Sequence, residues 1–275
     1  MEAPDTIRLL LTVHYDGAAF RGWQVQPGLR TVQGELQRVL SQLADAPRSV
    51  LGSGRTDAGV HATGQAATVD MPAHWTPREL RRSLNAMLDP DLWVESVHAV
   101  TADLHPRYDA VARTYAYDVG LLPRAASPFH SRWCWPLGDL AEDPLDVALL
   151  DAAAAAVVGD HSFESFAKAG QPERGDRCVV TLCDWADWSL GVRLRITADR
   201  FLHHMVRYLV GTMVDVARHR RPLEDVSRLL ERRGGLTTSP PAPAQGLFLS
   251  QVEYPEGALL GHDATLSPER SATTA

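Results

Sequence analysis

The 275-residue sequence has only three cysteines, a single lysine, and no apolar run near the ~18 residues needed to span a bilayer. Cys134, Cys178 and Cys183 are odd in number and form no CxxC pair, which is typical of a reducing compartment rather than of a disulfide framework. No basic stretch precedes the short apolar run at the start. We therefore expect no signal peptide and no membrane association, and we predict a cytoplasmic protein.

Positive charge is also scarce, because 27 Lys and Arg face 34 Asp and Glu and leave a net charge of -7. This balance weighs against a nucleic-acid partner, since phosphate binding relies on basic side chains. Residues 193–221 are an exception, with seven arginines against Asp199 and Asp215. Every basic residue except Lys168 is an arginine, whose planar guanidinium suits phosphates and bases. A local RNA-binding face and a mere compositional bias both remain open.

The pattern of apolar residues predicts the secondary structure. Helical spacing predicts helices over residues 31–44, 76–88, 143–160, 201–219 and 222–233. Apolar alternation and short apolar runs predict strands over residues 6–17, 48–55, 64–71, 92–100, 113–122, 179–189, 192–199 and 247–254. Thr76 followed by Pro77 is typical of a helix start, and Gly159 is expected to close the third helix.

The order of these elements predicts a duplication. Residues 6–100 follow the order strand, helix, strand, strand, helix, strand, and the second half repeats it with longer helices. We expect an α+β protein with two duplicated βαββαβ (RRM/ferredoxin-like) halves, whose antiparallel sheets join into one extended sheet with helices on one face. The halves would span residues 1–110 and 111–255. Residues 256–275 lack any periodic pattern, so we expect a disordered tail there.

The segment SGRTDAGVHATGQ, residues 53–65, places Arg55 and Asp57 two positions apart among small residues. If the backbone is extended, their side chains share a face and lie together in one cleft. An exposed ion pair contributes only about 0–1 kcal/mol to stability, so folding alone does not explain the pairing. The structural alternative is an aspartate that forms a turn beside a glycine.

The same segment closely resembles the signature of the tRNA pseudouridine synthase A family. Four further blocks resemble motifs of that family in the right order: YDGAAFRGWQVQPGLRTVQGEL (15–36), LHPRYDAVARTYAY (104–117), DRFLHHMVRYLVG (199–211) and APAQGLFLSQVEY (242–254). The resemblance implies a homodimer that isomerises uridine to pseudouridine at positions 38 to 40 of the tRNA anticodon stem-loop. It also implies that neither a metal nor a cofactor takes part.

The resemblance assigns three catalytic residues. Asp57 would be the nucleophile, Arg207 its ion-pair partner, and Tyr115 the ring that stacks on the target base and serves in proton transfer at carbon 5. The chemistry suits a carboxylate, which can attack the sugar or the base or remove a ribose proton, because nothing is oxidised, reduced or hydrolysed. An arginine partner lowers an aspartate pKa by about 1 to 3 units and so keeps the carboxylate ionised in a dry pocket. By its β-propensity alone, Tyr115 would be a packing residue.

Further residues are assigned to substrate binding. By the same resemblance, Arg55 takes the place that the flipped base vacates, and Leu247 forms an apolar pocket wall, although an ordinary core position suits Leu247 equally well. His61, His203 and His204 are interpreted as structural or RNA-contacting, and of the three His61 and His203 are predicted to bind the substrate. A zinc set of Cys178 and Cys183 with the two adjacent histidines matches no usual ligand spacing, so we expect no metal.

Two other functions stay open at this point. One is a noncatalytic RNA-binding or RNA-chaperone module on the same scaffold, since paired sheets of this kind also serve as plain RNA platforms. The other is a pseudouridine synthase that acts on another RNA or on a free nucleoside, which the acidic net charge allows. Asp57 beside Arg55 favours an enzyme, because a pure binder has no need for that carboxylate.

Overall fold

The computed structural model describes residues 6–138, 144–168, 175–232 and 235–260. The first half forms β1 (Thr6–Tyr15), α1 (Val32–Leu43), β2 (Val50–Gly52), β3 (His61–Pro72), α2 (Pro77–Met87) and β4 (Leu92–Val100), in the order predicted. The Thr76 side chain accepts a hydrogen bond from the Glu79 amide, and the Glu79 side chain accepts one from the Thr76 amide. This capping box satisfies amide groups that the first turn of α2 leaves unpaired.

The second half contains more elements than predicted. It forms β5 (Ala112–Gly120), β6 (Trp135–Pro136), α3 (Val147–Ala155), β7 (Gly159–Ser162), β8 (Arg177–Trp188), β9 (Gly191–Ala198), α4 (Met205–Ala217), α5 (Glu224–Leu230), β10 (Leu247–Glu253) and β11 (Leu259–Leu260). Within the described ranges, no helix is long and apolar enough to cross a membrane.

Two helix boundaries in this half differ from the prediction. The helix expected from residue 201 begins at Met205, because His204 adopts a left-handed backbone with φ of 65° and ends a turn there. The helix expected to close at Gly159 ends at Ala155, and Gly159, with φ of 122°, begins β7 instead. Asp143 and Arg233, at the outer ends of two predicted helices, lie outside the described residues.

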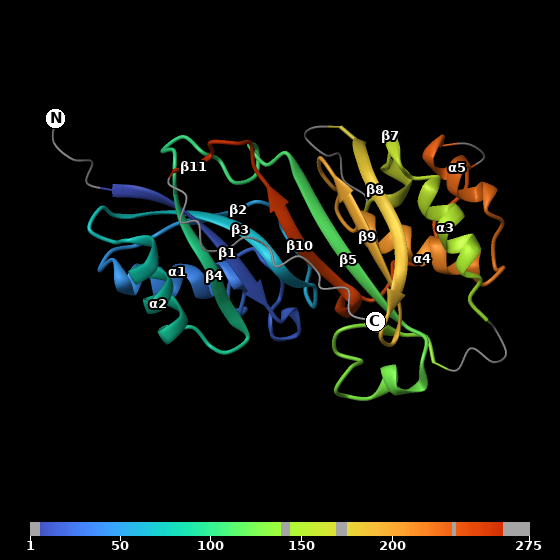
Figure 1. The fold of residues 1–275 in the computed structure, drawn as a ribbon, viewed down its shortest axis with the longest axis horizontal. Coiled ribbons are helices and arrows are strands. Elements are labelled where there is room, and N and C mark those ends of the chain that lie inside the picture. The colour runs from blue at the N-terminus through green and yellow to red at the C-terminus, as the bar shows by residue number, and fades with distance from the viewer. Residues whose placement is uncertain (1–5, 139–143, 169–174, 233–234, 261–275) are drawn as a thin grey trace, which may run out of the picture.

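The strands join into one 11-stranded sheet in the order β11-β4-β1-β3-β10-β5-β9-β8-β7, with β2 beside β3 and β6 beside β5. Figure 1 shows α1 and α2 beside the strands of the first half and α3, α4 and α5 beside those of the second. The predicted α+β class and single extended sheet are confirmed. Within each half the strands pair antiparallel as expected, except that the two-residue strand β6 runs parallel to β5. The join between the halves, for which no direction was predicted, is parallel, because β10 runs parallel to β3.

The strand β10 connects the two halves of the sheet. Phe248 and Leu249 pair with His61 and Ala62 of β3 on one side, and Leu249 pairs with Tyr115 of β5 on the other. A late segment of the chain therefore lies at the centre of the molecule, as Figure 1 shows.

The apolar cores of both halves lie on the same face of the sheet. Leu247 belongs to the core beneath α3 and α4, and Leu249 belongs to the core beneath α1 and α2. Side chains two residues apart in a strand point to the same face, so the helices of both halves cover one face of the sheet. Tyr115 packs against both cores and therefore lies where they meet.

The expected tail is only partly described. Leu259 and Leu260 form β11, which pairs with Val100 and Ala99 of β4. These pairs satisfy backbone groups that an edge strand otherwise leaves open. Residues 261–275 lie outside the described residues.

Candidate active site

Asp57 lies in the loop between β2 and β3, so the extended backbone on which its pairing with Arg55 was conditional is absent. The predicted strand 48–55 ends at Gly52, and β3 begins at His61. Arg55 is exposed, whereas the Asp57 side chain is 24% exposed and contacts residues of the second half. The idea that Arg55 and Asp57 share one strand face is therefore wrong.

Hydrogen bonds from the first half hold this loop. The Thr56 hydroxyl bonds the Tyr15 hydroxyl at 2.8 Å, and the Thr56 carbonyl accepts from the Trp23 amide at 3.0 Å. The buried Gln65 side-chain amide donates to the Gly54 carbonyl at 3.1 Å. These three anchors, at Gly54 and Thr56, fix the backbone immediately before Asp57.

Two glycines of the segment 15–36 allow the close approach to this loop. A Cβ at Gly17 would overlap the Val60 carbonyl. Gly22 has φ of 91°, and a Cβ there would lie 2.7 Å from the Thr56 carbonyl oxygen. Only glycine fits both the space and the left-handed conformation, so the segment 15–36 supports the loop that carries Asp57.

The Asp57 carboxylate is surrounded by three nitrogen-bearing side chains from the second half. His203 Nε2 lies 3.1 Å from Oδ1, His204 Nε2 lies 3.0 Å from Oδ2, and Arg207 Nη1 lies 3.4 Å from Oδ2. The predicted pair of Asp57 and Arg207 is thus present. We call these four residues the Asp57 cluster.

Arg207 is fixed by more than its ion pair. Its side chain is 16% exposed, and its Nε–H donates to the Ala242 carbonyl at 2.7 Å. The Ala242 amide in turn donates to the Arg207 carbonyl at 2.9 Å. The segment before β10 therefore orients the guanidinium toward Asp57.

His204 was not assigned to the site from the sequence, although it touches Asp57 as closely as His203 does. Burial lowers the pKa of His204, while the charge of Asp57 acts in the opposite direction. The lowered pKa favours the neutral imidazole, whose Nε2 lies against the carboxylate oxygen that Arg207 also contacts. The sequence contained one signal that pointed to His204. It precedes Arg207 by three residues near the start of a helix, and residues at this spacing lie on the same side of a helix.

Tyr115 extends from β5 between Leu249 and Ile196 of the neighbouring strands. Its ring meets that of Phe201 edge to face, with centroids 4.9 Å apart. Burial raises the pKa of Tyr115 to about 12; the charge of Arg113 acts against this shift and that of Asp57 adds to it. The phenol therefore keeps its proton at neutral pH, in an apolar setting that the charge of Asp57 reaches.

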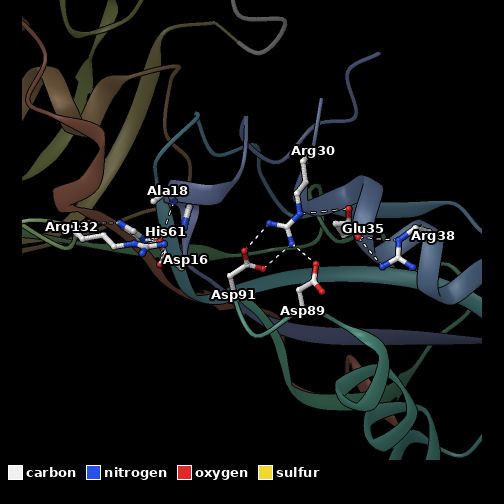
Figure 2. Close-up of polar contacts among 10 residues, drawn as sticks. Asp16, Ala18, Arg30, Glu35, Arg38, His61, Asp89, Asp91 and Arg132 are labelled. Atoms are coloured by element: carbon white, nitrogen blue, oxygen red, sulfur yellow. Dashed lines mark hydrogen bonds and ion pairs between the residues drawn. The ribbon is translucent and has the colours of Figure 1, made fainter. Parts of the chain in front are cut away.

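His61 does not lie with the other predicted substrate-binding residues, although the sequence placed it there. It is buried, its ring stacks on Phe248 with centroids 4.8 Å apart, and burial lowers its pKa. Nδ1 accepts from the Gly17 amide at 3.0 Å, and Nε2 lies 3.1 Å from the Arg132 carbonyl. Figure 2 shows His61 beside Arg132 and Asp16, which pair at 2.7 Å. Because both ring nitrogens are engaged within the protein, we assign His61 a structural role.

Leu247 is a buried residue at the start of β10, opposite Tyr117 of β5. It packs in the core beneath α4 together with Met205 and Leu209. Of the two readings that the sequence allowed, this packing favours the ordinary core position.

The zinc set considered from the sequence is not assembled. Cys178 and Cys183 are buried in β8, where burial raises the pKa of both thiols. Across the part of the chain that the structure describes, the one group of at least three residues that could hold a metal is Asp57, His203 and His204. Neither cysteine belongs to it.

A hollow of about 1030 Å³ lies elsewhere, lined by Thr12, Gly64, His98 and Gln251 among others. Leu11 and Val13, the neighbours of Thr12 in β1, belong to the core beneath α1 and α2. Because successive side chains of a strand point to opposite faces, Thr12 and the hollow lie on the face that these helices do not cover. None of the residues of the Asp57 cluster lines it.

Comparison with known proteins gives consistent matches. A family model described as tRNA pseudouridine synthase matches residues 11–109 and 153–255, which include all four residues of the Asp57 cluster. The tRNA pseudouridine synthase A of Solibacter usitatus is 38% identical over 250 residues, which cover 90% of this chain and 99% of the relative. That of Pelodictyon phaeoclathratiforme is 38% identical over 247 residues, with 89% and 98% covered. That of Chlamydia trachomatis serovar A is 33% identical over 253 residues, with 91% and 93% covered.

Proposed function

The chain belongs to the tRNA pseudouridine synthase family, and from this premise we propose that it isomerises uridine to pseudouridine in tRNA, at positions 38 to 40 of the anticodon stem-loop, with Asp57 as the catalytic carboxylate. The observation that carries the proposal is the Asp57 cluster, in which a carboxylate from one half meets three nitrogen ligands from the other. Folding does not explain the arrangement, because Asp57, His204 and Arg207 are 24%, 18% and 16% exposed and an ion pair taken largely out of water is weak evidence for a stabilising role.

The reaction needs an ionised carboxylate and no external reagent. The bond from uracil N1 to ribose C1′ breaks, the base turns, a bond from C5 to C1′ forms, and the proton lost from C5 is balanced by one gained at N1. Asp57 acts either by attack on the sugar or base or by removing a ribose proton. Arg207 stabilises its negative charge, and His204 fixes the direction of Oδ2.

Access to the carboxylate is proposed to run past His203. The His203 side chain is 56% exposed, whereas those of His204 and Arg207 are 18% and 16% exposed. The exposed imidazole is the partner that an incoming nucleotide can displace from Oδ1 without breaking buried contacts. His203 therefore serves as a substrate-binding residue at the mouth of the site.

Tyr115 and Arg55 are proposed to receive the extruded nucleotide. Flipping a base out of a stem costs a few kcal/mol, and stacking on an aromatic ring returns about 1 to 3 kcal/mol. Tyr115 offers such a ring, and its hydroxyl, whose raised pKa keeps it protonated, suits proton transfer at C5. Arg55 is exposed on the same loop as Asp57, where its guanidinium can occupy the space left in the stem.

The fold supports a further proposal, that the two halves are duplicates divided near residue 110. The first half has the strand order β4-β1-β3-β2, and the second has β10-β5-β9-β8. In both, a helix follows the first strand of the half and another precedes the last. The homodimer and the cytoplasmic location remain predictions from the sequence.

The test compares wild-type protein with Asp57→Asn on an unmodified tRNA transcript labelled with tritium at uridine C5. Wild type is expected to release tritium and to place pseudouridine at positions 38 to 40. Asp57→Asn should bind the transcript equally but lose activity by about a thousandfold or more. Asp45→Asn is the matched control, because Asp45 is exposed with φ of 47°, a conformation that asparagine tolerates.

The outcomes separate the alternatives. Product formation by Asp57→Asn would show that another group is the catalyst. A wild type that binds tRNA without forming product would support the noncatalytic module instead. Activity on a free uridine compound without activity on tRNA would indicate a different substrate.

A further inference from the structure

The Asp57 cluster has the geometry of a three-ligand metal site. One ligand atom from each of Asp57, His203 and His204 lies within 4.8 Å of the others. The two imidazole nitrogens are 3.1 and 3.0 Å from separate carboxylate oxygens. Tetrahedral zinc with bonds of about 2.0–2.1 Å holds its ligand atoms about 3.3 Å apart, so ligand atoms that lie within 4.8 Å of one another need shifts of at most about 1.5 Å.

The donor set selects the class of metal. Two imidazoles and one carboxylate suit Zn²⁺ and Co²⁺, whereas Mg²⁺ and Ca²⁺ prefer oxygen ligands alone. Three protein ligands leave one tetrahedral position open, as in sites where zinc keeps a water or a substrate atom. The exposed side of His203 provides a path for the ion.

The ligands are held before any ion arrives. The His203 carbonyl accepts from the Lys168 amide at 3.0 Å, and the Leu202 carbonyl accepts from the Met205 amide at 3.1 Å. These bonds fix the turn that presents both histidines, and the anchors of Thr56 fix the loop that carries Asp57. An ion therefore loses little affinity to ordering of the chain.

We propose that Asp57, His203 and His204 bind Zn²⁺, and that the bound ion keeps Asp57 from reacting with tRNA. Binding replaces the contacts of the two imidazoles with Asp57 by metal–nitrogen bonds and engages the carboxylate as a ligand. The second part of the proposal rests on the proposed function, since it requires Asp57 to be the catalytic group. Zinc would then act as a reversible inhibitor, which a chelator removes.

Arg207 sets a limit on the affinity. Its Nη1 lies 3.4 Å from the same oxygen that His204 contacts, and its positive charge opposes that of the ion. We therefore expect binding weaker than at a structural zinc site, in a range where changes in free zinc alter the occupancy.

Binding is tested with Co²⁺ on the full-length protein without tRNA. Wild type is expected to develop the intense visible absorption of tetrahedral Co²⁺ at one equivalent, and Zn²⁺ should displace the ion while Mg²⁺ should not. The double variant His203→Ala/His204→Ala should lose affinity by about tenfold or more. The matched control His74→Ala/His161→Ala removes two histidines outside the cluster and should behave like wild type.

Two results would overturn the assignment of the site: an unchanged Co²⁺ spectrum and affinity in the His203→Ala/His204→Ala variant, or displacement of Co²⁺ by Mg²⁺ as readily as by Zn²⁺. Circular dichroism checks the fold of each variant. His203→Ala alone, at an exposed side chain, provides the same comparison should the double variant unfold.

Inhibition is tested on wild type alone, so that no substitution disturbs the assay. Tritium release should fall with the occupancy of the Co²⁺-binding site as Zn²⁺ is added and should return with EDTA. Full activity at saturating Zn²⁺ would disprove inhibition by the bound ion, but it would not affect the assignment of the metal site. Absence of activity without any metal would instead count against the proposed function, and the Co²⁺ result would stand independently.

Discussion

Two charge clusters of this molecule have central groups of opposite sign, a guanidinium in one and a carboxylate in the other. Arg30 lies among three carboxylates, with Nη1 2.7 Å from Asp91, Nη2 3.0 Å from Asp89 and Nε 3.7 Å from Glu35, as Figure 2 shows. Asp57 lies among His203, His204 and Arg207. We call the first group the Arg30 cluster.

The clusters differ in what they connect. The Arg30 cluster joins the segment before α1, α1 itself and the loop after α2, all within the first half, and its guanidinium also covers the Phe20 ring at 4.3 Å. The Asp57 cluster joins a loop of the first half to the start of α4 in the second. Exposure of a single partner does not separate the clusters, because the side chains of Asp89 and His203 are 64% and 56% exposed. The difference is that the Arg30 cluster holds one half together, whereas the Asp57 cluster brings side chains of both halves to one carboxylate.

Among the partners of the two central groups, Arg207 should show the largest effect, because Arg207→Ala tests the charge balance of the Asp57 cluster. The variant leaves Asp57 without its guanidinium and the Ala242 carbonyl without its donor. We expect at least a hundredfold loss of tritium release and a destabilisation of about 1–3 kcal/mol. Single-turnover rates and urea unfolding measure the two effects separately.

The conservative variant Arg207→Lys is the control. A lysine has one ammonium group in place of the guanidinium fork, so it cannot serve Asp57 and Ala242 together, and we expect only partial recovery of the rate. A wild-type rate in Arg207→Ala would remove the ion pair from the mechanism and erase the distinction between the clusters.

Arg30→Gln should have a smaller effect than Arg207→Ala, and this effect should fall on stability and not on the rate of tritium release. The loss of contacts to Asp89, Asp91 and Glu35 should lower the free energy of unfolding by about 1–2 kcal/mol, because this is a network of partly exposed pairs. The rate per folded molecule should not change. Urea denaturation at fixed pH gives the first quantity and tritium release the second.

Arg38→Gln provides the matched control for Arg30→Gln, since Arg38 is more exposed and pairs only with Glu35, at 2.9 Å. It should cost less than about 0.5 kcal/mol. A lower rate of tritium release in Arg30→Gln, without a lower free energy of unfolding, would contradict the contrast between the clusters. The Arg30 cluster would then belong to the substrate surface.

The smallest effect should come from Asp70→Asn, an ion pair away from both clusters. Arg8 donates two hydrogen bonds to Asp70, and they hold the pKa of this carboxyl below its usual value. The stability from this pair is fully present above the unfolded-state pKa of about 3.9 and is lost as the pH falls through the lower folded-state pKa. Because the pair is half exposed, we expect about 0–1 kcal/mol at neutral pH.

Unfolding of wild type and Asp70→Asn should therefore be compared between neutral and acidic pH. The advantage of wild type should shrink toward the acid end. A difference that stays constant with pH would assign the effect to packing instead of to charge.

The local patterns of the sequence were enough to predict most elements. The start of α2 is determined locally, by Thr76, Pro77 and Glu79. The apolar alternation of β1 can likewise be recognised without knowledge of any distant partner. The partnership of Asp57 with Arg207, 150 residues apart, came instead from resemblance to a known family, because no local pattern connects them.

The features that were missed depend on contacts between distant segments. His204 takes its left-handed backbone in a turn that an apolar helical pattern conceals. His61 is buried because Phe248, Gly17 and Arg132 converge on it from three separate segments. The parallel pairing of β10 with β3 likewise follows from the joining of two halves, which periodicity within either half does not contain.

The central place of β10 has a consequence for biogenesis. During translation, every element from β1 to α5 leaves the ribosome before the strand that lies between β3 and β5. A nascent chain can complete each half's local contacts early, but the Ala242 support of Arg207 and the central strand arrive together afterwards. The contact that orients Arg207 toward Asp57 is thus completed as one of the last events of synthesis, and chains that end before Ala242 lack it.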